Sequence, residues 1–91
     1  MIKKDLQTAK KLVNQLINEI IDRWGSDQSG EFYMIRHRGT SEDMIEIQPT
    51  YHNVFYAVGD FVHVAEVCGC SFYMDCQENQ NGIMTPTLHI Y

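Results

Sequence analysis

Apolar residues near the start of the chain recur at steps of three and four, which is the spacing of one face of an α-helix. Polar residues fill the positions between them, so we expect a helix over residues 2–24 with one broad buried face. Gly25 follows where a left-handed C-terminal cap is needed. The apolar positions are Ile2, Leu6, Ala9, Leu12, Val13, Leu16, Ile17, Ile20, Ile21 and Trp24.

The same spacing returns later in the chain and predicts a second helix. Thr50 is the expected N-cap, and Gly69 is the residue expected to end the helix. Gly59 falls inside this segment, where glycine costs about 1 kcal/mol relative to alanine. We therefore expect the backbone to pack closely against a neighbour at Gly59. The apolar positions are Tyr51, Val54, Phe55, Val58, Phe61, Val62, Ala65 and Cys68.

Each predicted helix is followed by two strand-like segments. The expected order is α-β-β-α-β-β, which describes a two-layer α+β fold with two helices packed on one face of a four-stranded antiparallel sheet. We expect residues 1–91 to form a single domain. The strand-like segments are residues 31–38, 44–48, 70–78 and 83–91.

The loop of the second hairpin sets its register. A three-residue loop at 80–82, with Gly82 in the left-handed position, gathers the apolar residues on one face, whereas a two-residue turn divides them between the faces. The three-residue loop is therefore favoured. Because Pro86 has no N–H for a ladder, the last strand is expected at an edge of the sheet. The pairs predicted are Phe72 with Ile90, Met74 with Leu88 and Cys76 with Pro86.

The first hairpin is expected to have a five-residue loop at 39–43. This loop pairs Ile35 with Ile47 facing inward, and Arg36 with Glu46 facing outward as a cross-strand ion pair.

A repeated triplet raises an alternative for this hairpin. Phe-Tyr-Met occurs at 32–34 and again at 72–74, at matching places in the two helix–hairpin units. If the repeat marks a duplication, Phe32 and Met34 should face inward, which contradicts the register above. The two units would be residues 1–48 and 50–91.

Charge is distributed unevenly along the 91 residues, whose net charge is −5. Residues 1–38 hold all seven basic residues and five acids, whereas residues 39–91 hold seven acids and no lysine or arginine. This asymmetry excludes a uniformly basic nucleic-acid binder.

Two features bear on the compartment. The polar residues after Lys3 and Lys4 do not fit the apolar core of a signal peptide, and no segment approaches the ~18 apolar residues of a membrane span. The three cysteines cannot all pair within one chain, which favours reduced thiols. We therefore expect a cytoplasmic protein that does not enter membranes.

The cysteines are the first candidates for chemistry. Cys70 and Cys76 are six residues apart on one strand, roughly 20 Å, which is too far to share a metal ion. We expect Cys70, Phe72, Met74 and Cys76 to form one stripe of the core, where cysteine behaves as a small apolar residue. A site that combines Cys68 with a distant histidine is the alternative, and no metal or other cofactor is predicted.

A stripe on the second helix is the next candidate. His52, Tyr56, Asp60 and His63 step by four, four and three residues opposite the apolar face. Nothing supplies a nucleophile or a third converging ligand, so we interpret the stripe as a solvated or interface surface. A small-ligand binder that uses this stripe is the alternative function.

Basic residues offer another alternative. Lys3, Lys4, Lys10 and Lys11 lie near one side of the first helix, and Arg36 and Arg38 share a strand face. Together they could contact phosphates, but the chain has no phosphate-binding loop or DNA-binding motif. A nucleic-acid-binding domain therefore stays an alternative, and nucleic acid is not the expected partner.

The sheet surface away from the helices is the favoured functional surface. It is expected to display tyrosine, methionine and arginine, which are enriched at protein interfaces, and no lysine. We predict a small acidic non-enzymatic interaction module, an adaptor or inhibitor that forms a homodimer, binds a basic protein, or both. The predicted interaction residues are Met34, Arg36, Met44, Tyr73, Asp75, His89 and Tyr91.

Overall fold

The computed structural model has the element order α-β-β-α-β-β. The α+β class and the antiparallel sheet are confirmed. For β1 the backbone alone is described. The elements are α1 (Leu6–Trp24), β1 (Tyr33–Arg36), β2 (Ile45–Pro49), α2 (Val58–Val67), β3 (Phe72–Glu78) and β4 (Met84–Ile90). The structure describes residues 3–24, 33–36, 44–49, 55, 57–79 and 82–91.

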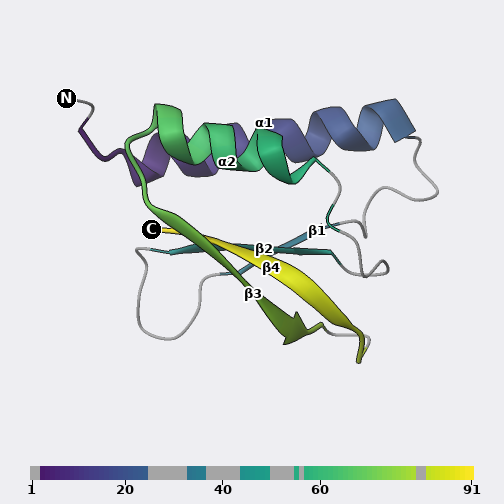
Figure 1. Ribbon diagram of the computed structural model, residues 1–91. Coiled ribbons are helices and arrows are strands. Elements are labelled where there is room, and N and C mark those ends of the chain that lie inside the picture. The colour runs from purple at the N-terminus through teal and green to yellow at the C-terminus, as the bar shows by residue number, and fades with distance from the viewer. Residues whose placement is uncertain (1–2, 25–32, 37–43, 50–54, 56, 80–81) are drawn as a thin grey trace.

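Both helices lie side by side over one face of the sheet (Figure 1). The strands are ordered β1-β2-β4-β3 and every neighbouring pair is antiparallel. Neither described helix is both long enough and apolar enough to cross a membrane.

The core fills the space between the helices and the sheet. Alternate residues of β2 and β4 face the helices, and their side chains are fully buried against α1 and α2. Burial of apolar area at this junction is the main favourable contribution to folding. The buried apolar residues are Ala9, Val13, Ile20, Ile45, Ile47, Phe55, Phe61, Val64, Ala65, Cys68, Cys70, Leu88 and Ile90.

Both hairpin registers are as expected from the sequence. In the first, Ile35 pairs with Ile47 and Arg36 with Glu46. Met34 is paired with Gln48, so its register position does not match that of Met74, and the duplication loses this support. In the second hairpin the predicted pairs, Phe72 with Ile90, Met74 with Leu88 and Cys76 with Pro86, are all present.

The glycine of the second hairpin has the expected conformation. Gly82 has φ 76°, the left-handed region that a residue with a β-carbon adopts only under strain. Its N–H donates to the Asn79 carbonyl at 3.0 Å, and the Asn79 N–H donates to Ile83 at 2.8 Å, which closes the loop.

The strand that contains Pro86 lies in the middle of the sheet, so the expectation that it forms an edge is wrong. Ser71 and Tyr91 exchange two backbone hydrogen bonds, of 2.8 and 2.9 Å. In an antiparallel ladder such pairs alternate with pairs whose amides point away, and Pro86 with Cys76 is one of the latter. The nitrogen of Pro86 therefore faces β2, and the β3–β4 ladder loses no hydrogen bond.

The β2–β4 ladder ends where proline would interrupt it. Its last pair is Ile47 with Leu88. In the same register, the next pair that exchanges hydrogen bonds would be Pro49 with Pro86, and neither residue has an N–H. The two prolines thus set the length of this ladder.

Because β4 is central, β3 becomes an edge strand, and the expected core stripe is wrong in part. Cys70 is buried, but Phe72 and Met74 are 42% and 44% exposed, and Cys76 is exposed as well. Alternation places Phe72 and Met74 on the helix side of the sheet as predicted, yet their strand lies at its margin.

The first helix begins at a side-chain cap that the hydrophobic pattern did not specify. The Asp5 carboxylate accepts hydrogen bonds from the Thr8 hydroxyl at 2.6 Å and the Thr8 N–H at 3.0 Å, and these bonds hold the pKa of Asp5 below its usual value. The Asp5 N–H donates to the Cys68 carbonyl at 2.8 Å, which ties the start of α1 to the end of α2.

The second helix begins later than the pattern predicts. Its N-cap is Ala57, which is left-handed with φ 61°. The expected N-cap, Thr50, lies outside the described residues. Gly59 is therefore in the first turn of the helix. A β-carbon at Gly59 would meet nothing within 4 Å, so the expectation of close packing there is wrong. The end is as expected, with Gly69 left-handed at φ 68°.

Two substitutions test the description of the start of α2. Ala57→Gly removes the strain of a left-handed alanine, and Gly59→Ala improves helix propensity in open space, so each should raise the free energy of unfolding by about 0.5–1 kcal/mol. Urea unfolding followed by circular dichroism measures the change. Gly82→Ala is the matched control and should lower the free energy of unfolding, since φ there is 76°. An equal loss in Gly59→Ala and Gly82→Ala would contradict this description of the helix start.

Candidate interaction surface on the sheet

A row of polar residues crosses the sheet on the face opposite the helices. The register aligns Glu46 of β2 with His89 of β4, and His89 with Tyr73 of β3. Arg36 of β1 is paired with Glu46 and continues the row in the backbone. Hydrophobic residues at the alternate positions fix this face, because a one-residue slip would invert it.

His89 is the centre of the row. Its Nε2 lies 2.7 Å from Oδ1 of Asp75, and its ring stacks on Tyr73 with centroids 4.3 Å apart and planes at 7°. Gln77 donates its side-chain amide to Asp75 at 3.0 Å and so holds the carboxylate in place. On the other side of the ring, Nδ1 is 3.8 Å from Oε1 of Glu46, which is longer than a hydrogen bond.

The centre of the row is buried and its β3 end is exposed. His89 is 1% exposed and Glu46 0%, whereas Asp75 is 44% exposed. Buried ionisable groups are tolerated when they are paired, and removing one member leaves the other uncompensated. The row therefore acts as a fixed support that orients Tyr73 and Asp75 at the margin of the sheet.

Four of the seven predicted interaction residues lie together, namely Tyr73, Asp75, His89 and Tyr91. Tyr91 packs edge-on against Tyr73, with ring centroids 5.7 Å apart. His89 was expected on the displayed surface, and this is wrong, because its ring lies beneath Tyr73 in a central strand.

The remaining predicted residues belong to β1 or precede β2, across β4 from the β3 residues. Met44 precedes β2 and is half-buried. Met34 and Arg36 are placed by their backbone pairing with Gln48 and Glu46. Their side chains lie outside the described part of the chain.

The most exposed apolar residues of the described chain gather around β3. Phe72 and Met74 lie on the helix side and Tyr73 on the other, so both faces of the strand are open. Sequence reasoning placed Phe72 and Met74 in the core, since alternation identifies a face and not the position of the strand in the sheet. The exposed set is Val67, Phe72, Tyr73, Met74, Met84 and Tyr91.

A groove of about 380 Å³ lies between the two helices. It contains Asp60 and His63 from the predicted stripe, together with Glu19 and the apolar side chains of Leu12 and Leu16. The other two stripe residues, His52 and Tyr56, lie outside the described residues.

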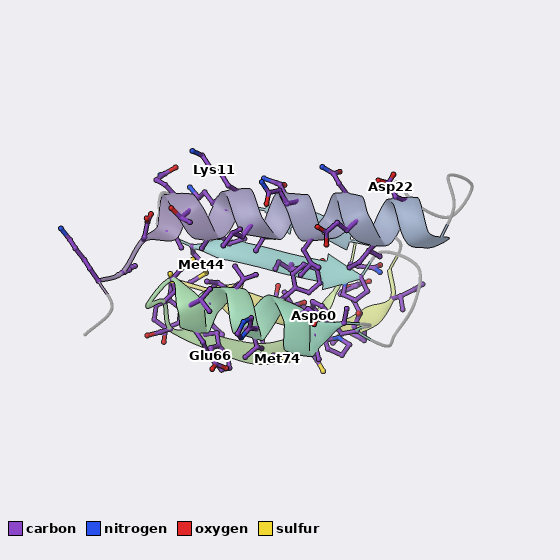
Figure 2. The ribbon with its side chains drawn as sticks, turned by 90° about the horizontal axis from the view of Figure 1, so that it is seen from above. Lys11, Asp22, Met44, Asp60, Glu66 and Met74 are labelled. Atoms are coloured by element: carbon purple, nitrogen blue, oxygen red, sulfur yellow. The ribbon has the colours of Figure 1, made fainter. Side chains whose placement is uncertain are left out.

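The lysines that the structure describes lie away from the exposed residues around β3. Lys3, Lys4 and Lys11 are exposed, and Lys11 is on the side of α1 that faces away from α2, whereas Met74 and Glu66 are on the opposite side of the molecule (Figure 2). Arg38 and the side chain of Arg36 lie outside the described part of the chain, so the predicted basic surface stays a prediction.

No family model, curated protein or solved structure matches the chain. Within the described residues, no three histidine, cysteine or acidic side chains are grouped so that they could hold a metal ion.

Removing the central histidine should weaken the fold. His89→Leu removes one hydrogen-bond partner of Asp75 and the ring under Tyr73, so the free energy of unfolding should fall by about 2–4 kcal/mol in urea titrations. Tyr73→Phe keeps the stacked ring and should change it by less than about 0.5 kcal/mol. An equal loss of unfolding free energy in the two variants would show that the polar row does not stabilise the fold through the ring of His89.

The cysteines should differ in reactivity. Burial raises the pKa of the Cys68 thiol, with smaller contributions from Cys70 and Asp5, and Cys70 is buried as well. A disulfide reagent such as DTNB at pH 8 should modify one thiol rapidly, namely the exposed Cys76, and all three after unfolding in guanidinium. Cys76→Ser should abolish the rapid phase. A rapid phase that survives this substitution would contradict the burial of the other two thiols.

Proposed function

We propose that the protein is a non-enzymatic interaction module that binds a protein partner through the edge strand β3. The observation that carries this proposal is a seven-residue strand at the sheet margin with half-exposed aromatic and methionine side chains on both faces. Such an edge presents unpaired N–H and C=O groups together with apolar area, and both favour an added strand.

The edge lacks three of the features that commonly protect a sheet margin. Residues 72–78 contain no proline and no lysine, and all seven pair with β4 without a bulge. Phe72, Tyr73 and Met74 are each more than 40% exposed at its start. Contiguous exposed apolar groups on a small protein mark interaction sites.

The polar row supports binding rather than reaction. The Asp75 carboxylate is hydrogen-bonded to Nε2 of His89, and the Tyr73 ring covers the face of the His89 ring. These contacts orient two β3 side chains from below, which reduces the entropy lost when a partner orders them.

A basic protein is the second candidate partner. Glu66, Asp75 and Glu78 are exposed near the edge, and residues 39–91 contain no lysine or arginine. An acidic adaptor or inhibitor would bind a basic groove, and its association would weaken as salt is raised.

Photo-crosslinking from the edge tests the proposed function. Benzophenone-maleimide attached to Cys76 should form adducts with a bound protein on irradiation, either in the purified sample or in an extract of the source cells. The matched control carries the same probe on Lys11→Cys in a Cys76→Ser background, on the far side of α1 (Figure 2).

The yield from Cys76 should exceed the control yield by about fivefold or more, since cross-linking requires the partner at the labelled surface. Equal yields from the two positions, or none from Cys76, would overturn the proposed function.

A further inference from the structure

We infer that the partner at β3 is a second copy of this chain, paired antiparallel along β3 with a two-fold axis at Met74. This inference rests on the proposed function and names its partner. Two sheets would join edge to edge into one, with the helices of both copies on the same face.

The backbone of β3 presents the groups that this pairing needs. Because Ser71 and Tyr91 exchange hydrogen bonds across the β3–β4 ladder, the odd-numbered residues of β3 point their amides toward β4. The N–H and C=O groups of Phe72, Met74 and Cys76 therefore point outward. Under a two-fold axis at Met74, these outward residues meet one another as hydrogen-bonded pairs.

Charge disfavours two of the other axes that the backbone allows, and an axis nearer the start of β3 pairs fewer of its residues than an axis at Met74 does. An axis at Asp75, the middle of the strand, would set two Asp75 carboxylates directly opposite each other, which destabilises a ladder. An axis at Cys76 would set Met74 beside Glu78 of the second copy. An axis at Met74 sets Asp75 opposite Tyr73, and it sets Phe72 opposite Cys76 on the helix side.

The exposed apolar groups fit a two-layer partner better than an isolated peptide. Phe72 and Met74 face the helix side of β3, and Val67 of α2 is 46% exposed. Figure 2 shows Met74 on the side of α2 away from α1. A peptide strand would cover the backbone edge but not this helix side. A second copy brings its own α2 into the helix layer and the same apolar stripe beneath it.

The area available is appropriate for a modest dimer. The half-exposed rings of Phe72 and Tyr73 alone present roughly 130–200 Å², since aromatic side chains of this kind have about 150–250 Å² each. Met74, Val67 and the backbone edge add to this area. Dimer interfaces use about 800 Å² per subunit at standard size and less in weak complexes, so we expect micromolar affinity.

Sedimentation velocity between about 1 and 300 µM tests the second copy directly. The wild-type protein should pass from monomer to dimer in this range. Met74→Lys sets two lysines opposite each other at the axis and should raise the dimer Kd at least about tenfold. Met84→Lys is the matched control, because Met84 is 59% exposed on β4 and outside the pairing, and it should leave Kd within about twofold.

Both substitutions are at exposed methionines, so the fold should survive, and circular dichroism checks this. Raising sodium chloride from about 50 to 500 mM should leave Kd unchanged or lower it, because the opposed edges are acidic. A monomer at 300 µM, an unaffected dimer in Met74→Lys, or a dimer that salt dissociates would each overturn the inference.

A disulfide trap tests the register. Phe72→Cys places a thiol opposite Cys76 of the second copy, and paired antiparallel residues have the α-carbon separation of a disulfide, about 5.5 Å. In a glutathione redox buffer this variant should form a covalent dimer that reductant releases, whereas Phe72→Cys with Cys76→Ser should not. Wild-type protein cross-linked through Cys76 alone would overturn the axis at Met74.

The outcomes also separate this inference from the proposed function. If the free protein stays monomeric while the probe on Cys76 forms adducts of other masses, the interaction module stands and the second copy is wrong. If the probe on Cys76 gives no adduct of any mass, the proposed function fails with it.

Discussion

The antiparallel pairing of β2 with β4 joins the two helix–hairpin units, and most other features of the protein depend on it. It buries Ile45, Ile47, Leu88 and Ile90 beneath the helices and turns the opposite residues of the same strands into a polar row. It also moves β3 to the margin. Without this one contact between distant segments, each hairpin would keep its register and neither would have a defined edge.

The prolines limit this pairing and so shape the margin. Pro49 and Pro86 would form the next hydrogen-bonded pair of the β2–β4 ladder, and the ladder stops before them because neither has an N–H. Beyond it, Asn79 donates its side-chain amide to the Pro49 carbonyl at 3.1 Å, and Gln48 reaches the Gln77 carbonyl at 3.2 Å. Side chains thus replace backbone bonds where β4 and β2 separate, and the β3–β4 hairpin stays connected to the sheet.

The sequence was sufficient where the determinants are local. Alternation together with the loop length placed Ile35 opposite Ile47 and Phe72 opposite Ile90, because a slip of one residue would expose an entire apolar face. Strand order depends on contacts between residues more than forty apart, and no local pattern reports it.

Two errors share that origin. Pro86 was interpreted as a sign of an edge, although proline is also accommodated in a central strand where the neighbouring ladder has ended. The expected exposure of His89 is wrong for the same reason. Alternation assigns the face on which the ring lies, but it does not report that Tyr73 of the neighbouring strand covers the ring. Alternation placed Tyr73 and Asp75 of β3 on the face where they lie, whereas it assigned the exposed residues Phe72 and Met74 beside them to the core.

The two margins of the sheet differ in a way that bears on how an assembly would end. Among the described residues, the β1 margin has four and the β3 margin has seven. Short edge strands are poor templates for further pairing, so the proposed pairing through β3 would use the long margin of each copy and leave two short ones. A two-fold contact of this kind closes on itself, whereas a contact between unlike edges would extend into a filament. Asp75 strengthens the same outcome, because it disfavours the fully overlapped register and favours the one centred on Met74.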